Sequence, residues 1–90
     1  MLSLISPADV QIALREHIKI QRKKLKLSRE QLAERSTVPA PTIKKFETTG
    51  QISLRQFMLL WQSVDDLARL QQLMQPSQLP TTIAEVLNGR

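Results

Sequence analysis

The chain has 90 residues, which suffices for one domain with one hydrophobic core. Hydrophobic residues make up 41% of it and aromatic residues only 3%, a composition that favours packed helices over a β-sandwich. The absence of cysteine excludes disulfides and thiolate sites, and no apolar run approaches the roughly 20 residues of a membrane span. The first five residues lack the charged flank of a signal peptide, so we expect a cytoplasmic protein.

The net charge of +5 is unevenly distributed, because seven of the thirteen basic residues fall between positions 15 and 29 and only Glu16 opposes them. A local positive field of this kind favours nucleic acid or an anionic membrane, and an ordinary solvated helix face is the alternative. The seven are Arg15, Lys19, Arg22, Lys23, Lys24, Lys26 and Arg29.

The first predicted helix covers residues 7–25. Ser6 supplies a capping hydroxyl, Pro7 suits the first helical position, and Asp9 places an acid in the first turn. The apolar residues that recur near helical spacing are Val10, Leu14, Ile18 and Leu25.

A second and a third helix are predicted close together. Ser28 and Gln31 form a capping box that opens a short helix ending near residue 36. Residues 37–39 can form only a tight turn, and Pro41 requires the next helix to begin at residue 39 or 40 and to end near 48. The residues expected to face inward are Leu32, Ala33, Ile43 and Phe46.

Gly50 closes the third helix or the loop that follows it, and Ser53 caps a fourth helix that covers residues 54–62. Five consecutive apolar residues, 57–61, predict a helix buried on two sides. A fifth helix over residues 64–74 offers more apolar surface than a small monomer can cover, so we expect a dimer. Its predicted interface consists of Phe57, Met58, Leu60, Trp61, Leu67 and Leu70.

Prolines at positions 76 and 80 divide the chain into a main domain, residues 1–75, and a linker with a short tail, residues 76–90. Thr82 can cap one last turn that carries Ile83, Val86 and Leu87. Because such a short amphipathic turn is not stable by itself in water, we expect it to fold against a second subunit or another protein.

Two short helices joined by a tight turn and preceded by a basic helix have the layout of a DNA-reading helix-turn-helix. The framework Leu25-x-Leu27-Ser28-x-x-Gln31-Leu32-Ala33, followed by Val38, Ile43, Phe46 and Glu47, resembles the Cro and phage-repressor (XRE) family over residues 14–70. The resemblance implies an all-α, five-helix, lambda-repressor-like domain. Thr37 departs from the family's usual glycine, so it must adopt a left-handed backbone or change the turn.

A narrower resemblance lies in residues 41–57, in the Ser6-Pro7 pair and in residues 60–63, which are similar to HipB-type antitoxins. This resemblance implies a homodimeric transcriptional repressor that binds palindromic operator DNA and autoregulates its operon. It also implies a second partner, a HipA-like serine/threonine kinase toxin, against which the tail is expected to fold.

The family resemblance also assigns roles to residues. The start of the third helix faces the major groove, and the base-reading candidates there are Ala40, Pro41, Thr42, Lys44 and Lys45. Arg29 is expected to contact a phosphate, with help from Ser28 and Gln31, although both are foremost caps. Arg22 and Glu47 are expected to form a structural ion pair, and Arg22 is expected to reach a phosphate as well.

The sequence offers no arrangement for catalysis. His17 is the single histidine, expected on a helix surface, and there is neither a metal-ligand set nor a glycine-rich loop for a nucleotide. We therefore expect no enzyme, metal or cofactor and no membrane partner. The alternative function is a protein-interaction module built on a helix-turn-helix that does not bind DNA; Ala40 and Pro41 favour it, and Lys44 and Lys45 oppose it.

Overall fold

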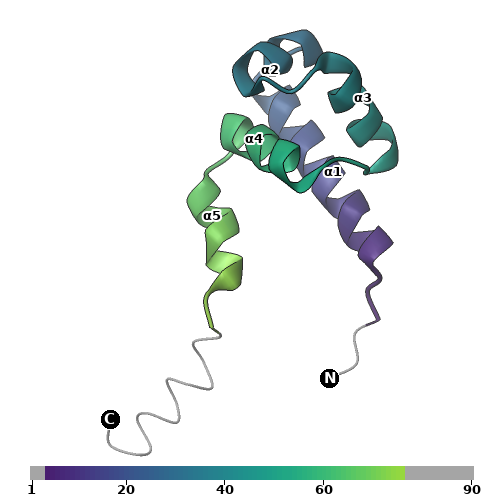
Figure 1. Ribbon diagram of the computed structural model, residues 1–90, viewed down its shortest axis with the longest axis vertical. Helices are drawn as coiled ribbons and strands as arrows, with labels where there is room; N and C mark the ends of the chain where they lie inside the picture. Colours follow the sequence, from purple (N-terminus) through teal and green to yellow (C-terminus); the bar gives the residue numbers. More distant parts are fainter. Residues whose placement is uncertain (1–3, 77–90) are drawn as a thin grey trace, which may run out of the picture.

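The computed structural model describes residues 4–76, which form five α-helices and one 3₁₀-helix and contain no strand (Figure 1). The prediction of an all-α chain is confirmed for this part. The elements are α1 (Pro7–Lys24), α2 (Arg29–Ser36), α3 (Ala40–Thr49), α4 (Leu54–Val64), α5 (Leu67–Gln71) and η1 (Gln72–Met74). The predicted turn that carries Ile83, Val86 and Leu87 lies outside the described residues.

Side-chain caps define where the helices begin. Ser6 and Ser28 both open capping boxes, since each hydroxyl accepts a hydrogen bond from the third helical N–H. The side chain at that third position, Asp9 or Gln31, accepts in return from the backbone N–H of the cap. Ser53 accepts from the backbone N–H of Gln56 at the start of α4. These three predicted starts are confirmed.

Left-handed residues end α2 and α3. Thr37 has φ of 65° and Gly50 has φ of 79°, and each donates its N–H to a carbonyl four residues back. Of the two conformations predicted for Thr37, the chain therefore adopts the left-handed one. A Cβ at Gly50 would lie 3.3 Å from the Cβ of Gln11, so the position also brings α1 and the end of α3 close together.

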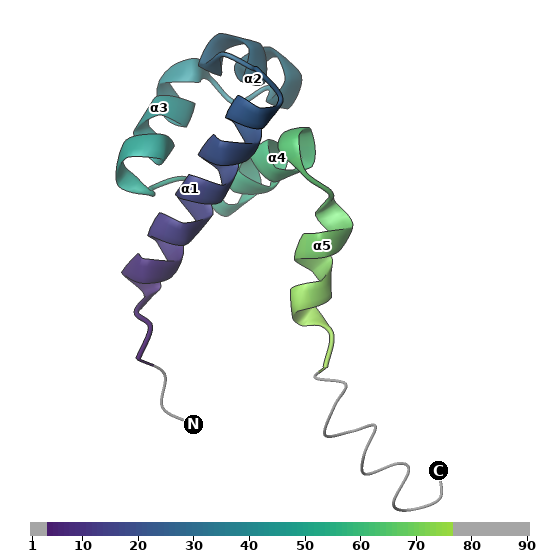
Figure 2. The same ribbon diagram turned by 180° about the vertical axis from the view of Figure 1, so that it is seen from behind.

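One core joins α1 to α4. The fully buried side chains come from all four helices and from the turn between α2 and α3, and α4 packs across both α1 and α2 (Figure 2). Leu25 and Val10, two of the apolar residues that recur near helical spacing, are about half exposed, because α1 ends at Lys24 and its first half extends beyond α4. The core residues are Ile18, Leu27, Leu32, Val38, Ile43, Phe46, Phe57, Leu60, Trp61 and Val64.

The predicted dimer interface separates into two groups. Leu60 is 0% exposed, and Phe57 and Trp61 are also buried in the core of the single chain, so the prediction that these three meet a second subunit is wrong. A run of consecutive apolar residues does not show which of them face the chain's own core. Met58 and Leu67 are exposed and Leu70 is half-buried, so these three remain at the surface.

The boundary between the last two α-helices differs from the prediction. Val64 ends α4 rather than beginning α5, and Asp65 is extended. Asp66 then caps α5 by accepting a hydrogen bond from the N–H of Ala68, and the indole of Trp61 donates to the carbonyl of Asp66 (2.8 Å). These contacts hold a break between the helices that apolar periodicity alone does not reveal.

His17 is not a simple surface residue as predicted. Its ring stacks on Trp61 with centroids 4.7 Å apart, and its Nε2 lies 2.7 Å from the carboxylate of Asp65. Arg69 donates to the same carboxylate at 2.7 Å. This cluster joins α1, the end of α4 and the start of α5, so it fixes the direction in which α5 leaves the core.

Candidate nucleic-acid interface

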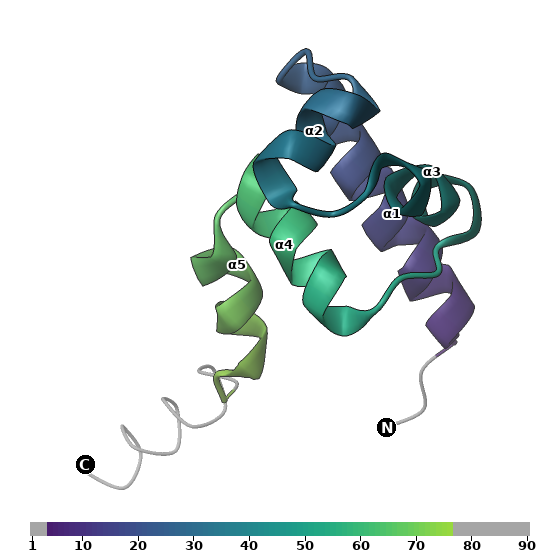
Figure 3. The same cartoon turned by 45° about the horizontal axis from the view of Figure 1, so that its top comes forward.

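The turn between α2 and α3 is short and internally bonded. Residues 37–39 connect the helices, and Ser36 accepts a hydrogen bond on its hydroxyl from the N–H of Val38 (3.1 Å). Val38 is buried in the core beside Leu32 and Ile43. The turn is therefore anchored by packing as well as by hydrogen bonds, which holds α3 at a fixed angle to α2 (Figure 3).

The second half of α3 is fastened to α1. Arg15 donates to the carbonyl of Thr48 (2.9 Å), and Gln11 donates to the carbonyl of Gly50 (3.3 Å). Phe46 is buried, and its ring meets that of Phe57 edge to face at 5.8 Å. With its C-terminal half held in this way, α3 presents its first turns outward.

Glu47 is the centre of a buried ion network. Its carboxylate accepts two hydrogen bonds from Arg22, at 2.8 and 3.0 Å, and one from Arg29 at 3.0 Å. Arg22 uses its remaining terminal nitrogen to donate to the carbonyl of Leu27 (2.8 Å). The bidentate geometry ties the end of α1 and the start of α2 to α3. It confirms the predicted pairing of Arg22 with Glu47.

The same network determines the protonation of Glu47. Burial of the carboxyl raises its pKa, but the hydrogen bonds and positive charges of Arg22 and Arg29 outweigh that effect, so the pKa of Glu47 lies below its ordinary value of 4.5. Glu47 is therefore ionised in the folded chain at neutral pH, when its two arginine partners are charged.

Arg22 is buried and forms its hydrogen bonds within the fold. It is only 8% exposed, and its hydrogen bonds all run to Glu47 and to the carbonyl of Leu27. Three of the five N–H groups of Arg22 are used in this way, and the predicted phosphate contact of Arg22 stays a prediction. Arg29 differs, since a third of its side chain remains exposed while it contacts Glu47. Its bond to Glu47 was not predicted, and no spacing in the sequence indicates it.

The predicted reading residues lie together at the start of α3. Pro41, Lys44 and Lys45 are exposed, and Ala40 and Thr42 are half-buried. Within residues 4–76, neither lysine forms an ion pair. Ser28 and Gln31 form the α2 capping box, in which the side chain of each accepts a hydrogen bond from the backbone N–H of the other. Capping was the first role predicted for both residues.

The first turns of α3 form a ridge between two open hollows. One hollow, of about 480 Å³, lies between α3 and the start of α4, and Lys45 lines it with Gln51 and Gln56. The other, of about 420 Å³, lies between α3 and the start of α2, where Lys44 borders Arg29. Pro41 lines both hollows, so it stands at the crest of the ridge.

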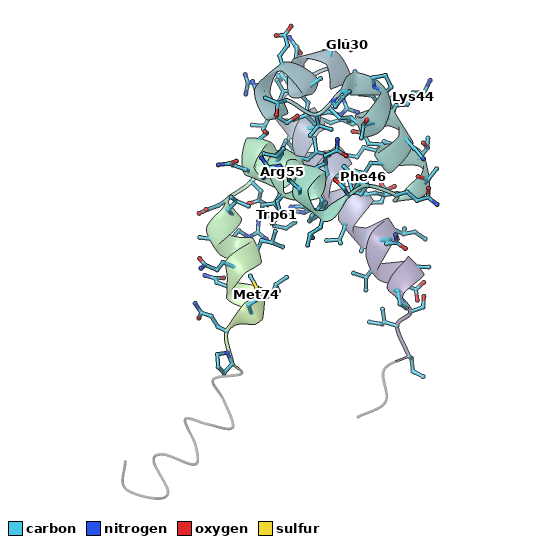
Figure 4. All side chains as sticks on the ribbon, viewed as in Figure 1. Glu30, Lys44, Phe46, Arg55, Trp61 and Met74 are labelled. Carbon is cyan, nitrogen blue, oxygen red and sulfur yellow. The ribbon has the colours of Figure 1, made fainter. Side chains whose placement is uncertain are left out.

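Five residues that line the hollows were not predicted as DNA contacts: Glu30, Gln51, Ile52, Ser53 and Gln56. Glu30 lies with Lys44 at the outer end of the α2 and α3 pair (Figure 4), and Gln51 and Gln56 flank Lys45. Glu30 directly follows Arg29, the predicted phosphate contact, and this position in the sequence was a signal that Glu30 lies at the same surface. Gln56 stands at the capping-box position after Ser53, and its side chain accepts from the Ser53 hydroxyl (3.1 Å).

The basic cluster of residues 15–29 consists of two kinds of side chain. Its three arginines hold carbonyls or carboxylates of the fold, as described for Arg15, Arg22 and Arg29. Its lysines at positions 23, 24 and 26 are exposed, and Lys26 has φ of 57°, which reverses the chain after α1. The positive field at the surface therefore comes mainly from lysines and from Arg29.

In the part of the chain that the structure describes, no three histidine or acidic side chains gather where a metal ion could bind. None of its helices combines the length and apolarity needed to cross a membrane. We compared the chain with known proteins, and no protein-family model, no curated protein and no solved structure matches it.

Proposed function

We propose that the chain is a sequence-specific DNA-binding transcriptional repressor that places α3 in the major groove as the reading helix of a lambda-repressor-like helix-turn-helix. The single observation that carries this proposal is the α3 ridge with an open hollow on each side. Lys44 borders one hollow and Lys45 borders the other. A major groove about 12 Å wide admits one α-helix. The sugar-phosphate strands on its two sides require space and positive charge beside that helix.

The side chains on the ridge suit different contacts. Ala40 and Pro41 have no hydrogen bond to give from their side chains and suit a thymine methyl group, whereas Thr42 can bond a base or a phosphate. Lys44 can donate to guanine O6 or N7, and we assign base reading to Lys44 and phosphate binding to Lys45. Glu30, beside Lys44, has a carboxylate that suits the amino group of cytosine.

Phosphate binding on the α2 side falls to Arg29. Its exposed portion borders the same hollow as Lys44, and its bond to Glu47 directs the guanidinium from a fixed position. The N-terminus of α2 adds backbone N–H groups that favour an anion. Arg29 is therefore positioned before DNA arrives, which reduces the side-chain entropy lost on binding.

We further propose a homodimer that binds two half-sites about 10 base pairs apart, or a small multiple of that spacing. The exposed apolar side chains of Met58 and Leu67, with half-buried Leu70, support this arrangement, because they lie together on one face of α4 and α5. A role as the antitoxin of a HipA-like kinase is supported by the sequence resemblance of residues 41–57.

The experiment that tests DNA binding begins with selection of ligands from random duplexes by the full chain. The selected duplex is then titrated with the wild-type protein and two variants at several salt concentrations. We expect Lys44→Ala to relax preference at one base pair by about 1–3 kcal/mol. Arg29→Ala should weaken binding to all sequences and reduce the slope of log affinity on log salt by about 0.9.

Lys19→Ala provides the matched control, because Lys19 is a half-buried α1 lysine that lines neither hollow. Circular dichroism establishes that each variant is folded, which matters most for Arg29 because of its bond to Glu47. If selection enriches no sequence and binding is undetectable at low salt, the proposal is wrong, and the protein-interaction module becomes the better account.

A further inference from the structure

An apolar groove lies on the side of α4 away from the α3 ridge. Its volume is about 390 Å³, and it opens between the first half of α1 and the helix pair α5 and η1, which diverge from α4 (Figures 1 and 2). Met74 lies on the side of that pair that faces α1 (Figure 4). The lining includes Val10, Leu14, Phe57, Met58, Leu70 and Met74.

The lining of the groove requires an apolar occupant. Almost no polar surface borders it, and Val10, Leu73 and Met74 remain between 46% and 77% exposed in the described chain. Contiguous exposed apolar surface of this kind in a small protein marks a contact site. The depression that carries Leu67 shares Met58, Leu70 and Met74 with this groove. The side chains on the α1 side, Val10 and Leu14, line the groove alone, so it overlaps only in part with the dimer surface proposed above.

The described chain ends where such an occupant could begin. Pro76 follows the lining residue Met74 by two positions, and Ile83, Val86 and Leu87 follow within the next eleven. The seven residue steps from Pro76 to Ile83 can span up to roughly 25 Å. That reach is sufficient for the segment to return along α5 into the groove, and proline at positions 76 and 80 favours turns in the chain.

We propose that residues 83–87 of the chain dock in its own groove, with Ile83, Val86 and Leu87 against Met58 and Met74. The three apolar side chains would cover the exposed apolar lining of the groove. The groove in turn supplies the packing surface that a short amphipathic turn needs to form. Docking within the same chain is favoured over docking on a second copy, because the short connection gives the segment a high effective concentration. The α3 ridge stays free.

The sequence itself makes this proposal testable by paramagnetic relaxation. The chain has no cysteine, so Asn88→Cys carries a single nitroxide label, and its three methionines include Met58 and Met74 in the groove. In the full chain with ¹³C-labelled methionine methyl groups, we expect both groove methyls to relax several-fold faster in the oxidised than in the reduced label state. The matched control adds Ile83→Asp, Val86→Asp and Leu87→Asp, which should remove most of that enhancement.

A second sample mixes spin-labelled chains lacking ¹³C with ¹³C-labelled chains lacking the spin label. Enhancement confined to the first sample, in which each chain carries both labels, and lost with the aspartates, supports docking within one chain. Enhancement of the same size in the mixed sample overturns the proposal in favour of a second copy. The proposal is also overturned if there is no enhancement, or if the aspartates leave the enhancement unchanged. In either case the apolar side chains of the segment do not pack in the groove.

Discussion

The bundle of α1 to α4 and the α5 arm, residues 65–76, are held by different kinds of interaction. The bundle has a continuous core and a buried carboxylate with two arginine partners. The α5 arm has no buried residue in its helices. It contacts the bundle through Leu70, which packs against the core, and through the cluster of Trp61, His17 and Asp65. The position of α3 is thus determined by the whole core, whereas that of α5 depends on a few side chains.

This difference separates the proposed functions of the two regions. Reading DNA requires side chains held in fixed positions, and the bundle provides this by fastening α3 at both its ends. The α5 arm carries exposed apolar side chains that need a second surface. Substitutions should therefore have unequal effects in the two regions.

The largest contrast is expected between two apolar truncations. Phe46→Ala removes a ring that is 2% exposed at the centre of the bundle and should lower the free energy of unfolding by about 3–5 kcal/mol. Leu73→Ala, at 77% exposure in the α5 arm, should change it by no more than about 0.5 kcal/mol. Urea denaturation followed by circular dichroism measures both. Equal losses would contradict the contrast between the regions.

The buried carboxylate provides the next test. Glu47→Gln removes the negative charge opposite Arg22 while keeping a similar shape, so Arg22 is left buried without a counter-charge. We expect a loss of about 3 kcal/mol, at the low end for broken buried pairs, because the carbonyl of Leu27 still accepts from Arg22. The control is Glu34→Gln on the exposed surface of α2, which should cost almost nothing.

Acid sensitivity follows from the same two regions. The pKa values of Glu47 and Asp65 lie below their ordinary values of 4.5 and 3.8, so the unfolded chain takes up protons at these sites before the folded chain does. Both sites therefore stabilise the fold fully above their ordinary pKa, and this contribution is lost as pH falls through the folded values. Denaturation midpoints measured from pH 6 to pH 3 should fall less in Glu47→Gln than in the wild type.

The sequence predicted most of the bundle because local signals and tertiary structure agree there. Ser28 with Gln31 defined the start of α2 by chemistry that operates within four residues, and Pro41 restricted the start of α3 in the same way. The pairing of Arg22 with Glu47 came from the family resemblance. The additional bond from Arg29 depends on how three helices meet, which no local pattern specifies.

Around the α5 arm, the sequence was less informative. Trp61 was assigned to a dimer surface although it packs on His17, because the contact joins residues 44 positions apart in sequence. Asp66 carries a helix-starting signal, but the surrounding apolar spacing continues through it and favoured one longer helix. The start of α5 was therefore predicted three residues too early.

A smaller effect is expected at Asp65, which joins the two regions. Asp65→Asn removes the charge that faces His17 and Arg69 and should cost about 1 kcal/mol, because an amide oxygen can still accept one hydrogen bond. Trp61 is the single tryptophan of the chain, so its near-ultraviolet circular dichroism reports whether the His17 ring remains stacked on it. An altered tryptophan signal with unchanged binding to selected DNA is the expected result. Loss of DNA binding would show that the α5 arm also positions α3.

The smallest effect is expected at the turn between α2 and α3, and it should be stabilising. Thr37 has φ of 65°, a conformation that costs a residue with a Cβ about 1–2 kcal/mol, whereas glycine adopts it freely. Thr37→Gly should gain only about 0.5 kcal/mol, because glycine loses more entropy on folding and the Thr37 hydroxyl no longer donates to the carbonyl of Ser36. The matched control is Gly50→Ala, which imposes the opposite change at φ of 79° and brings a Cβ to 3.3 Å from that of Gln11, so it should destabilise the bundle. Thermal denaturation of both variants measures the two shifts. If Thr37→Gly also destabilises the bundle, the threonine side chain stabilises the turn by more than its backbone conformation costs.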